Sequence, residues 1–274
     1  MCREEFHLSQ ASLQHSDAKD FVRSPWFPAV VVTIYRFIIA GYCLGWIIYS
    51  GFHPANGDEK WFIYLTNWGF TFVTLYYIWA TVVSLLHHCG ATNTVAGMQM
   101  KATGNRDIDA EGGGGLGAND FEEPPVSMSW YHKGLWVIFN MAANSSILIT
   151  LLYWTLIFGG KTSGLDVTTH LLNCVFMIGD LMLSTTPVRI LHVLYALILG
   201  VCYILLTVIF WAADGTNARG EPYIYSYVDY NETPGFSSGL IIGFVFVGQP
   251  LSQAVLFGLY KLRCFLAEKC GKDI

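Results

Sequence analysis

Long apolar runs separated by short polar segments dominate the chain. A helix needs about 20 apolar residues to cross a bilayer. Five runs meet this length, at residues 27–50, 61–86, 133–158, 188–212 and 238–260. A sixth run, 166–184, is weaker because it contains His170, Asn173 and Asp180. Counting it puts both termini on one side of the membrane, whereas omitting it puts them on opposite sides.

The positions of the basic residues decide between these two topologies. With six helices, most of the 15 lysines and arginines fall on one side, in the N-terminal tail, before the third helix and in the C-terminal tail. Lys60, Lys161 and Arg219 fall on the other side, and Arg36 lies inside the first helix. Lysine and arginine accumulate on the cytosolic side of membrane proteins. The sequence therefore predicts an all-α polytopic membrane bundle of six transmembrane helices with both termini cytosolic.

The predicted organisation has three parts. A cytosolic N-terminal tail covers residues 1–26, a six-helix transmembrane domain covers 27–262, and a cytosolic C-terminal tail covers 263–274. Within the domain, residues 88–130 contain a glycine run and adjacent prolines, and are predicted to form a flexible cytosolic loop.

The predicted outer loop, residues 213–237, has two distinctive features. Its tyrosines alternate with polar residues, which is compatible with a lid on the bundle or with aromatic anchors at the lipid headgroups. It also contains the sequon Asn231-Glu232-Thr233, so Asn231 is a predicted glycosylation site, although it lies close to the sixth helix.

Composition and charge narrow the range of functions. Hydrophobic residues make up 53% of the chain and charged residues 13%, against about 25% charged residues in a typical soluble domain. The net charge of −5 leaves no basic patch for a nucleic-acid partner. The seven cysteines are scattered without a CxxC pair, which predicts neither a disulfide framework nor a metal site. No cofactor is predicted, and the expected partner is the lipid bilayer of the plasma membrane or the endoplasmic reticulum.

A small polar cluster is predicted beneath the outer surface. At 1.5 Å per residue, Thr66 lies about 8 Å and His170 about 6 Å below that surface, on two helices that run in the same direction. Asn67 and Asn173 lie close to the same level. A hydroxyl beside an imidazole is the smallest unit of nucleophilic catalysis, and Asn67 or a backbone N–H could stabilise the oxyanion. The alternative is a threonine bonded to its own helix and a histidine that reaches the headgroups.

Arg36 and Asp180 form a second predicted pair. Both charges lie within apolar runs, toward the cytosolic side, and neither can face lipid cheaply. They are predicted to form a structural ion pair, with proton or ion transport as the alternative. Asp180 lies about 15 Å along the helix axis from His170, too far to orient it directly.

The segment 61–69, WFIYLTNWG, resembles the start of the second helix in rolling stone proteins. The N-terminal segment CREEF and the segment Ser24-Pro25-Trp26 also resemble the corresponding parts of rolling stone proteins. The resemblance covers nearly the whole chain. It implies a six-pass membrane protein linked to myoblast fusion.

A more distant resemblance is to the androgen-induced membrane hydrolases, which cleave branched fatty-acid esters of hydroxy fatty acids with a threonine and a histidine. Their aromatic-x-Leu-Thr stretch is matched by Tyr64-Leu65-Thr66 with one residue fewer. His170 and Asp180 keep the family's spacing between histidine and acid, although the acid is Asp rather than Glu. This resemblance implies that Thr66 and His170 are catalytic and that an acyl-lipid ester is the substrate. Cell fusion without chemistry and intramembrane ester hydrolysis are therefore two separate hypotheses.

Overall fold

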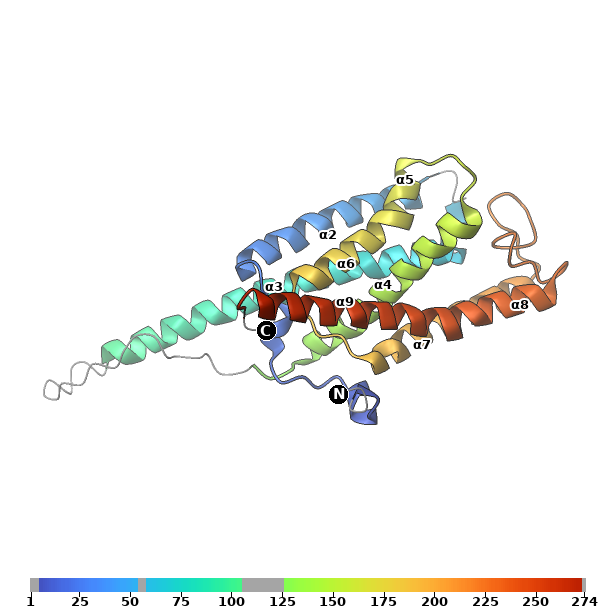
Figure 1. Cartoon of the computed structure of the whole chain (residues 1–274). Helices are drawn as coiled ribbons and strands as arrows, with labels where there is room; N and C mark the ends of the chain where they lie inside the picture. The colour runs from blue at the N-terminus through green and yellow to red at the C-terminus, as the bar shows by residue number, and fades with distance from the viewer. Residues whose placement is uncertain (1–4, 54–57, 105–125, 273–274) are drawn as a thin grey trace, which may run out of the picture.

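The protein is helical throughout the part that the computed structural model describes (Figure 1). Residues 5–53, 58–104 and 126–272 are described, with the backbone alone at 58–59 and 91–104. Within these ranges there is no strand, which confirms the predicted all-α class.

The long helices follow the predicted apolar runs, and several of them are built from consecutive α- and π-helical pieces. The elements that form the bundle are α2 (Ala29–Gly51), α3 (Leu65–Gly104), α4 (Trp130–Leu152), η5 (Tyr153–Ile157), α5 (Gly164–Val167), η6 (Thr168–Leu172), α6 (Asn173–Leu183), α7 (Val193–Ala212), α8 (Pro234–Gly243), η8 (Phe244–Gly248) and α9 (Gln249–Lys269). Short 3-10 turns precede or connect them: η1 (Leu8–Ala11), η2 (Ala18–Phe21), η4 (Asp58–Ile63) and η7 (Ile190–His192).

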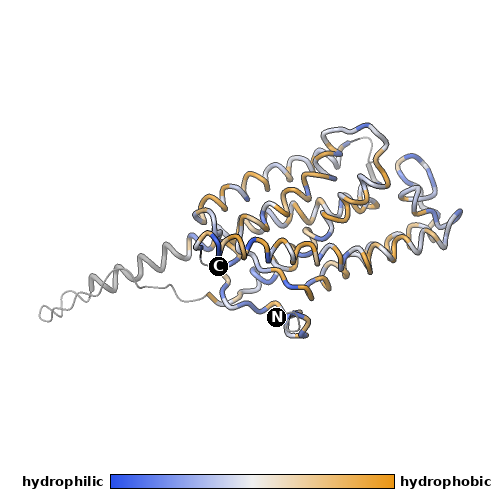
Figure 2. The backbone as a smooth tube through the Cα atoms, viewed as in Figure 1, coloured by the Kyte–Doolittle hydropathy of each residue, from blue (hydrophilic) through white to orange (hydrophobic). Residues whose placement is uncertain are grey.

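Six helical stretches in the described residues are long and apolar enough to cross a membrane, as predicted. The apolar residues run along these helices, and polar residues gather at both ends of the bundle (Figure 2). We call the end that carries residues 213–233 the loop end and the end that carries the chain termini the tail end (Figure 1). Helix α3 continues to Gly104, inside the segment predicted as a flexible loop, and residues 105–125 lie outside the described residues.

The core of the bundle forms where α3 and α4 pack together. Helix α3 contacts α2 on one side and α4 on the other, and α4 also contacts α6, α7 and α9. Aromatic side chains fill this centre: Tyr76, Tyr77, Trp136 and Phe139 are fully buried. The two helices approach closely at Gly69, where an added Cβ would overlap Ile149. Thr66 lies one turn from that contact, so the close approach sets the position of Thr66 against α4.

A buried ion pair joins α2 to α6. Arg36 Nε and Nη2 donate to the two carboxylate oxygens of Asp180 at 2.8 and 2.9 Å, and both side chains are fully buried. Tyr76 of α3 donates its hydroxyl to the same carboxylate. Arg36 Nη1 donates to the main-chain carbonyl of Phe21 at 2.7 Å. Both charges therefore have several partners, which a charge needs when it is removed from water.

The N-terminal tail is part of this arrangement. Phe21 and Val22 are buried against the bundle, and the carbonyl of Asp20 accepts a hydrogen bond from Thr185 at 2.8 Å. Arg263 of α9 closes the same end, because its Nη1 donates to the carbonyls of Leu181, Ser184 and Thr186. A buried cation at the C-terminus of α6 satisfies carbonyls that the helix leaves unpaired. The tail end is therefore densely hydrogen-bonded, and a cavity of about 430 Å³ remains there beside Asp20 and Thr185.

Loss of Arg36 should destabilise the protein strongly. Arg36→Met leaves the Asp180 carboxylate buried without a counter-charge, which costs about 3–5 kcal/mol. We expect a clear fall in the temperature at which the detergent-solubilised protein leaves the monodisperse peak in size-exclusion chromatography. Lys261→Met is the matched control, because it removes an exposed ion pair with Glu5 that is worth about 0–1 kcal/mol. Equal stability of the two variants would contradict a stabilising role for the buried pair.

The orientation of the bundle can be tested at Asn231. Asn231 lies exposed in the loop-end segment, where its Oδ1 accepts a hydrogen bond from Trp211. If the loop end faces outward, wild-type protein from cultured animal cells should lose apparent mass on treatment with peptide N-glycosidase, and Asn231→Gln should not. A sequon introduced into residues 1–26 should stay unmodified. A glycan on that introduced sequon would reverse the proposed topology.

Candidate functional site

The structure brings Thr66 and His170 together at the loop end. Thr66 lies in the first turn of α3, and His170 lies in the π-helical turn η6 that precedes α6. Thr66 Oγ1 is 3.2 Å from His170 Nε2, within hydrogen-bond distance. The two residues are 104 positions apart in the chain, so the contact depends on the packing of α3 against η6.

The surroundings of His170 determine which ring nitrogen carries the proton. Nδ1 lies 3.0 Å from the main-chain carbonyl of Asp166, which can only accept a hydrogen bond. Nδ1 also lies 3.2 Å from the Thr169 hydroxyl, whose hydrogen is already donated to the Leu165 carbonyl. Because both neighbours are acceptors, Nδ1 is the protonated nitrogen of the neutral ring. Nε2 therefore presents its lone pair to the Thr66 hydroxyl.

Two aromatic side chains from the end of α4 hold the imidazole in place. The Tyr153 ring stacks on the His170 ring, with centroids 3.6 Å apart and an angle of 11° between the planes. Trp154 Nε1 donates to the main-chain carbonyl of His170 at 3.3 Å. Both residues belong to the π-helical turn η5. The histidine is thus fixed by η5 on one face and, at Nδ1, by the Asp166 carbonyl of α5.

Thr66 differs from the other hydroxyl residues of α3. Thr71, Thr74, Thr81 and Ser84 each donate to the carbonyl four residues earlier, at 2.6 to 2.8 Å. That bond is the usual behaviour of such residues in membrane helices. Thr66 begins the helix, so the residue four positions earlier, Phe62, belongs to η4. The hydroxyl of Thr66 points instead to His170.

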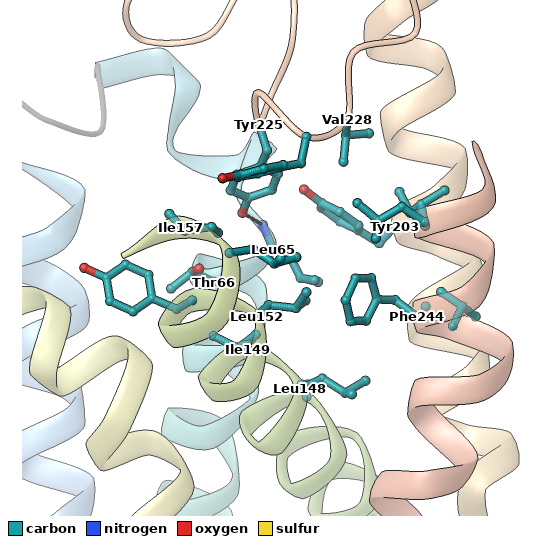
Figure 3. A pocket seen from close by; sticks show the side chains of 18 of the residues that line it. Leu65, Thr66, Leu148, Ile149, Leu152, Ile157, Tyr203, Tyr225, Val228 and Phe244 are labelled. Atoms are coloured by element: carbon teal, nitrogen blue, oxygen red, sulfur yellow. Dashed lines mark hydrogen bonds between the residues drawn. The ribbon is translucent and has the colours of Figure 1, made fainter. Parts of the chain in front are cut away.

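Two cavities meet at Thr66. The first, which we call the polar chamber, has a volume of about 430 Å³ and opens toward the loop end; Asn67, Asp166, His170, Arg219 and Glu221 are among its lining residues. The second, which we call the apolar pocket, has a volume of about 100 Å³ and lies between α4, α7 and α8 (Figure 3). Its walls are mainly leucine, isoleucine, valine and aromatic side chains. Thr66, Tyr153 and Tyr225 line both cavities.

The loop-end segment 213–233 covers the polar chamber. Lys60 Nζ donates to the Asn217 carbonyl at 2.8 Å, and Ala218 N donates to the Tyr64 hydroxyl at 3.3 Å. Tyr225 reaches furthest inward, where its hydroxyl accepts the main-chain N–H of Leu65 at 3.0 Å, directly beside Thr66 (Figure 3). Of the two alternatives for the tyrosines, these contacts favour a lid for this segment.

The other predicted site residues occupy different places. Asn67 lines the polar chamber, while its Nδ2 donates to the Trp61 carbonyl at 2.7 Å. Asn173 is fully buried and its Oδ1 accepts a hydrogen bond from Thr150 of α4, so its contacts are those of a residue that joins α6 to α4. Arg36 and Asp180 lie toward the tail end, apart from both cavities.

Sequence reasoning did not select Tyr153, Thr169 or Tyr225 as site residues. Each lies among similar residues in the chain, since Tyr153 lies within an apolar run and Tyr225 is one of several alternating tyrosines. The position of Thr169 beside His170 was visible, but its role depends on the π-helical turn. Tyr225 is recognised as a site residue only from the fold, because the loop folds back over the start of α3.

Comparison with known proteins gives two matches. The family described as Protein rolling stone matches residues 125–270. Protein rolling stone of Drosophila melanogaster is 30% identical over 251 residues, which cover 89% of this chain and 82% of that protein. No solved structure matches the chain. The family match contains His170 and Tyr225, whereas Thr66 lies N-terminal to it.

Proposed function

Because this chain belongs to the rolling stone family, we propose that it acts in cell fusion, as the family resemblance implies, and that its contribution is the hydrolysis of acyl-lipid esters. One observation carries the chemical part: the Thr66 hydroxyl faces the unprotonated Nε2 of His170 where an apolar and a polar cavity meet. The bundle is an integral membrane protein, so its substrates are drawn from the bilayer.

The first half of the reaction forms an acyl-enzyme. Thr66 Oγ attacks the ester carbonyl carbon while His170 Nε2 takes the hydroxyl proton. The tetrahedral intermediate collapses with cleavage of the bond to the alcohol oxygen. His170 returns the proton to that oxygen, so a neutral alcohol leaves and the acyl group stays on Thr66.

The second half releases the acid. His170 Nε2 takes a proton from a water molecule in the polar chamber, and the resulting hydroxide attacks the acyl carbon. The bond to Thr66 Oγ breaks, the threonine oxygen takes back the proton from His170, and the fatty acid leaves. The Asp166 carbonyl on Nδ1–H keeps the same ring orientation through both halves.

Tyr225 is placed to stabilise the oxyanion. Its hydroxyl accepts the Leu65 N–H, so its own O–H can donate to a second oxygen beside Thr66. A tyrosine hydroxyl is protonated at neutral pH, and burial raises the pKa of Tyr225 further above 10.0. A fixed donor at the developing negative charge is worth about 100- to 1000-fold in rate.

Labelling with a fluorophosphonate tests the nucleophile, because this group reacts covalently with activated hydroxyls. Membranes that express the wild type at matched levels should be labelled. Thr66→Ala should abolish labelling and His170→Ala should reduce it by at least about 100-fold. Thr71→Ala is the matched control: Thr71 lies on the same helix and is bonded to its own backbone, so labelling should stay at the wild-type level. An unlabelled wild type beside a labelled reference hydrolase would remove Thr66 as a nucleophile.

A cell-fusion assay separates the two parts of the proposal. If hydrolysis is the contribution to fusion, cells that express Thr66→Ala should fuse no more than cells without the protein, while Thr71→Ala should support full fusion. Fusion at the wild-type level by a stably expressed Thr66→Ala protein would show that the fusion role does not need this chemistry.

A further inference from the structure

The apolar pocket is continuous with the catalytic pair. Thr66 lies at one side of the pocket, with Tyr225 above it and Phe244 at the opposite side (Figure 3). Beyond Thr66 the pocket continues between Leu148, Ile149 and Val245. A carbonyl carbon at the Thr66 hydroxyl would therefore have apolar walls on one side and the polar chamber on the other.

The rim of the pocket reaches the lipid-facing surface between α4 and α8. Ile157, at the end of η5, is 42% exposed, and Leu152, Leu240 and Phe244 are partly exposed. Toward the tail end the same two chain segments close up, because Asn144 of α4 donates to Gln253 of α9 at 2.6 Å. The rim of the pocket is thus partly exposed near the loop end, and α4 is joined to α9 further along the bundle.

The inner end of the pocket has a marked polarity. Gln249 lines the pocket and is 5% exposed, and its Oε1 has no hydrogen-bond partner among the described residues.

We propose that the apolar pocket holds the carbonyl end of the acyl chain of a single-chain lipid ester, that the rest of the chain extends between α4 and α8 into the bilayer, and that the polar alcohol part lies in the polar chamber. This inference rests on the proposed hydrolase function. One chain is specified because, of the two cavities that meet at Thr66, one is apolar and the other is lined by charged residues. The acyl part takes the apolar side, because the leaving alcohol and the incoming water both need the polar side.

The assignment is tested by filling the pocket with a larger side chain at a position that does not contact Thr66 or His170. Leu240 lines the pocket from α8, so Leu240→Trp fills it without touching Thr66 or His170. Leu251→Trp is the matched control, because Leu251 is 63% exposed on α9 and does not line the pocket. Each protein is labelled in membranes with two probes, dodecyl fluorophosphonate and ethyl fluorophosphonate. Chain length alone changes how much probe enters the bilayer, so the comparison that decides is between proteins for each probe.

Leu240→Trp should slow labelling by the dodecyl probe about tenfold or more, since a small displacement of the reacting group is costly. Labelling by the ethyl probe should be slowed much less, and Leu251→Trp should match the wild type with both probes. If Leu240→Trp slows both probes equally, or neither, the pocket assignment is overturned while Thr66 remains the nucleophile. If the ethyl probe fails to label the wild type at all, the proposed function fails and the pocket assignment fails with it.

Discussion

The buried ion pair between Arg36 and Asp180 fixes how the helices meet, because neither charge can be left unpaired inside the membrane. The two charges lie on α2 and α6, and their further partners are the Tyr76 hydroxyl of α3 and the main-chain carbonyl of Phe21. Removing one partner leaves a charge that lipid cannot solvate. The pair therefore ties α2, α3 and α6 into one arrangement and orders the N-terminal tail beneath them.

The same constraint helps to position the candidate site. Tyr76 contacts Asp180 near the tail end, and Thr66 contacts His170 near the loop end. Thr66 lies ten positions before Tyr76, and His170 lies ten positions before Asp180. The two helices that carry these residues run in the same direction. Equal rise per residue then carries the register of one contact to the other, about 15 Å away. The Tyr76–Asp180 and Thr66–His170 contacts therefore join the same two helices at two levels of the bundle.

The helices and the level of their polar side chains could be predicted from the sequence. The apolar runs predicted six spans, and helix depth placed Thr66 level with His170 and Arg36 within reach of Asp180. The partners that complete these pairs could not be predicted. Phe21 and Asp166 contribute main-chain carbonyls, which have no side-chain signature. Arg263 counted as one more basic residue of the C-terminal tail, but it is fully buried against the end of α6.

The three π-helical turns in the described residues lie around the polar chamber and the apolar pocket. The π-helical turns η5, η6 and η8 supply Tyr153, His170 and Phe244, and each of these residues lines the apolar pocket or the polar chamber. The turn η8 directly precedes Gln249-Pro250, where proline cannot donate the usual helical hydrogen bond. An inserted residue widens a helix and redirects its side chains, so π-helical turns often mark functional sites. The hydrogen bonds of Arg36 and Arg263 brace the tail end of the helices that carry the candidate site, and a site needs a rigid support.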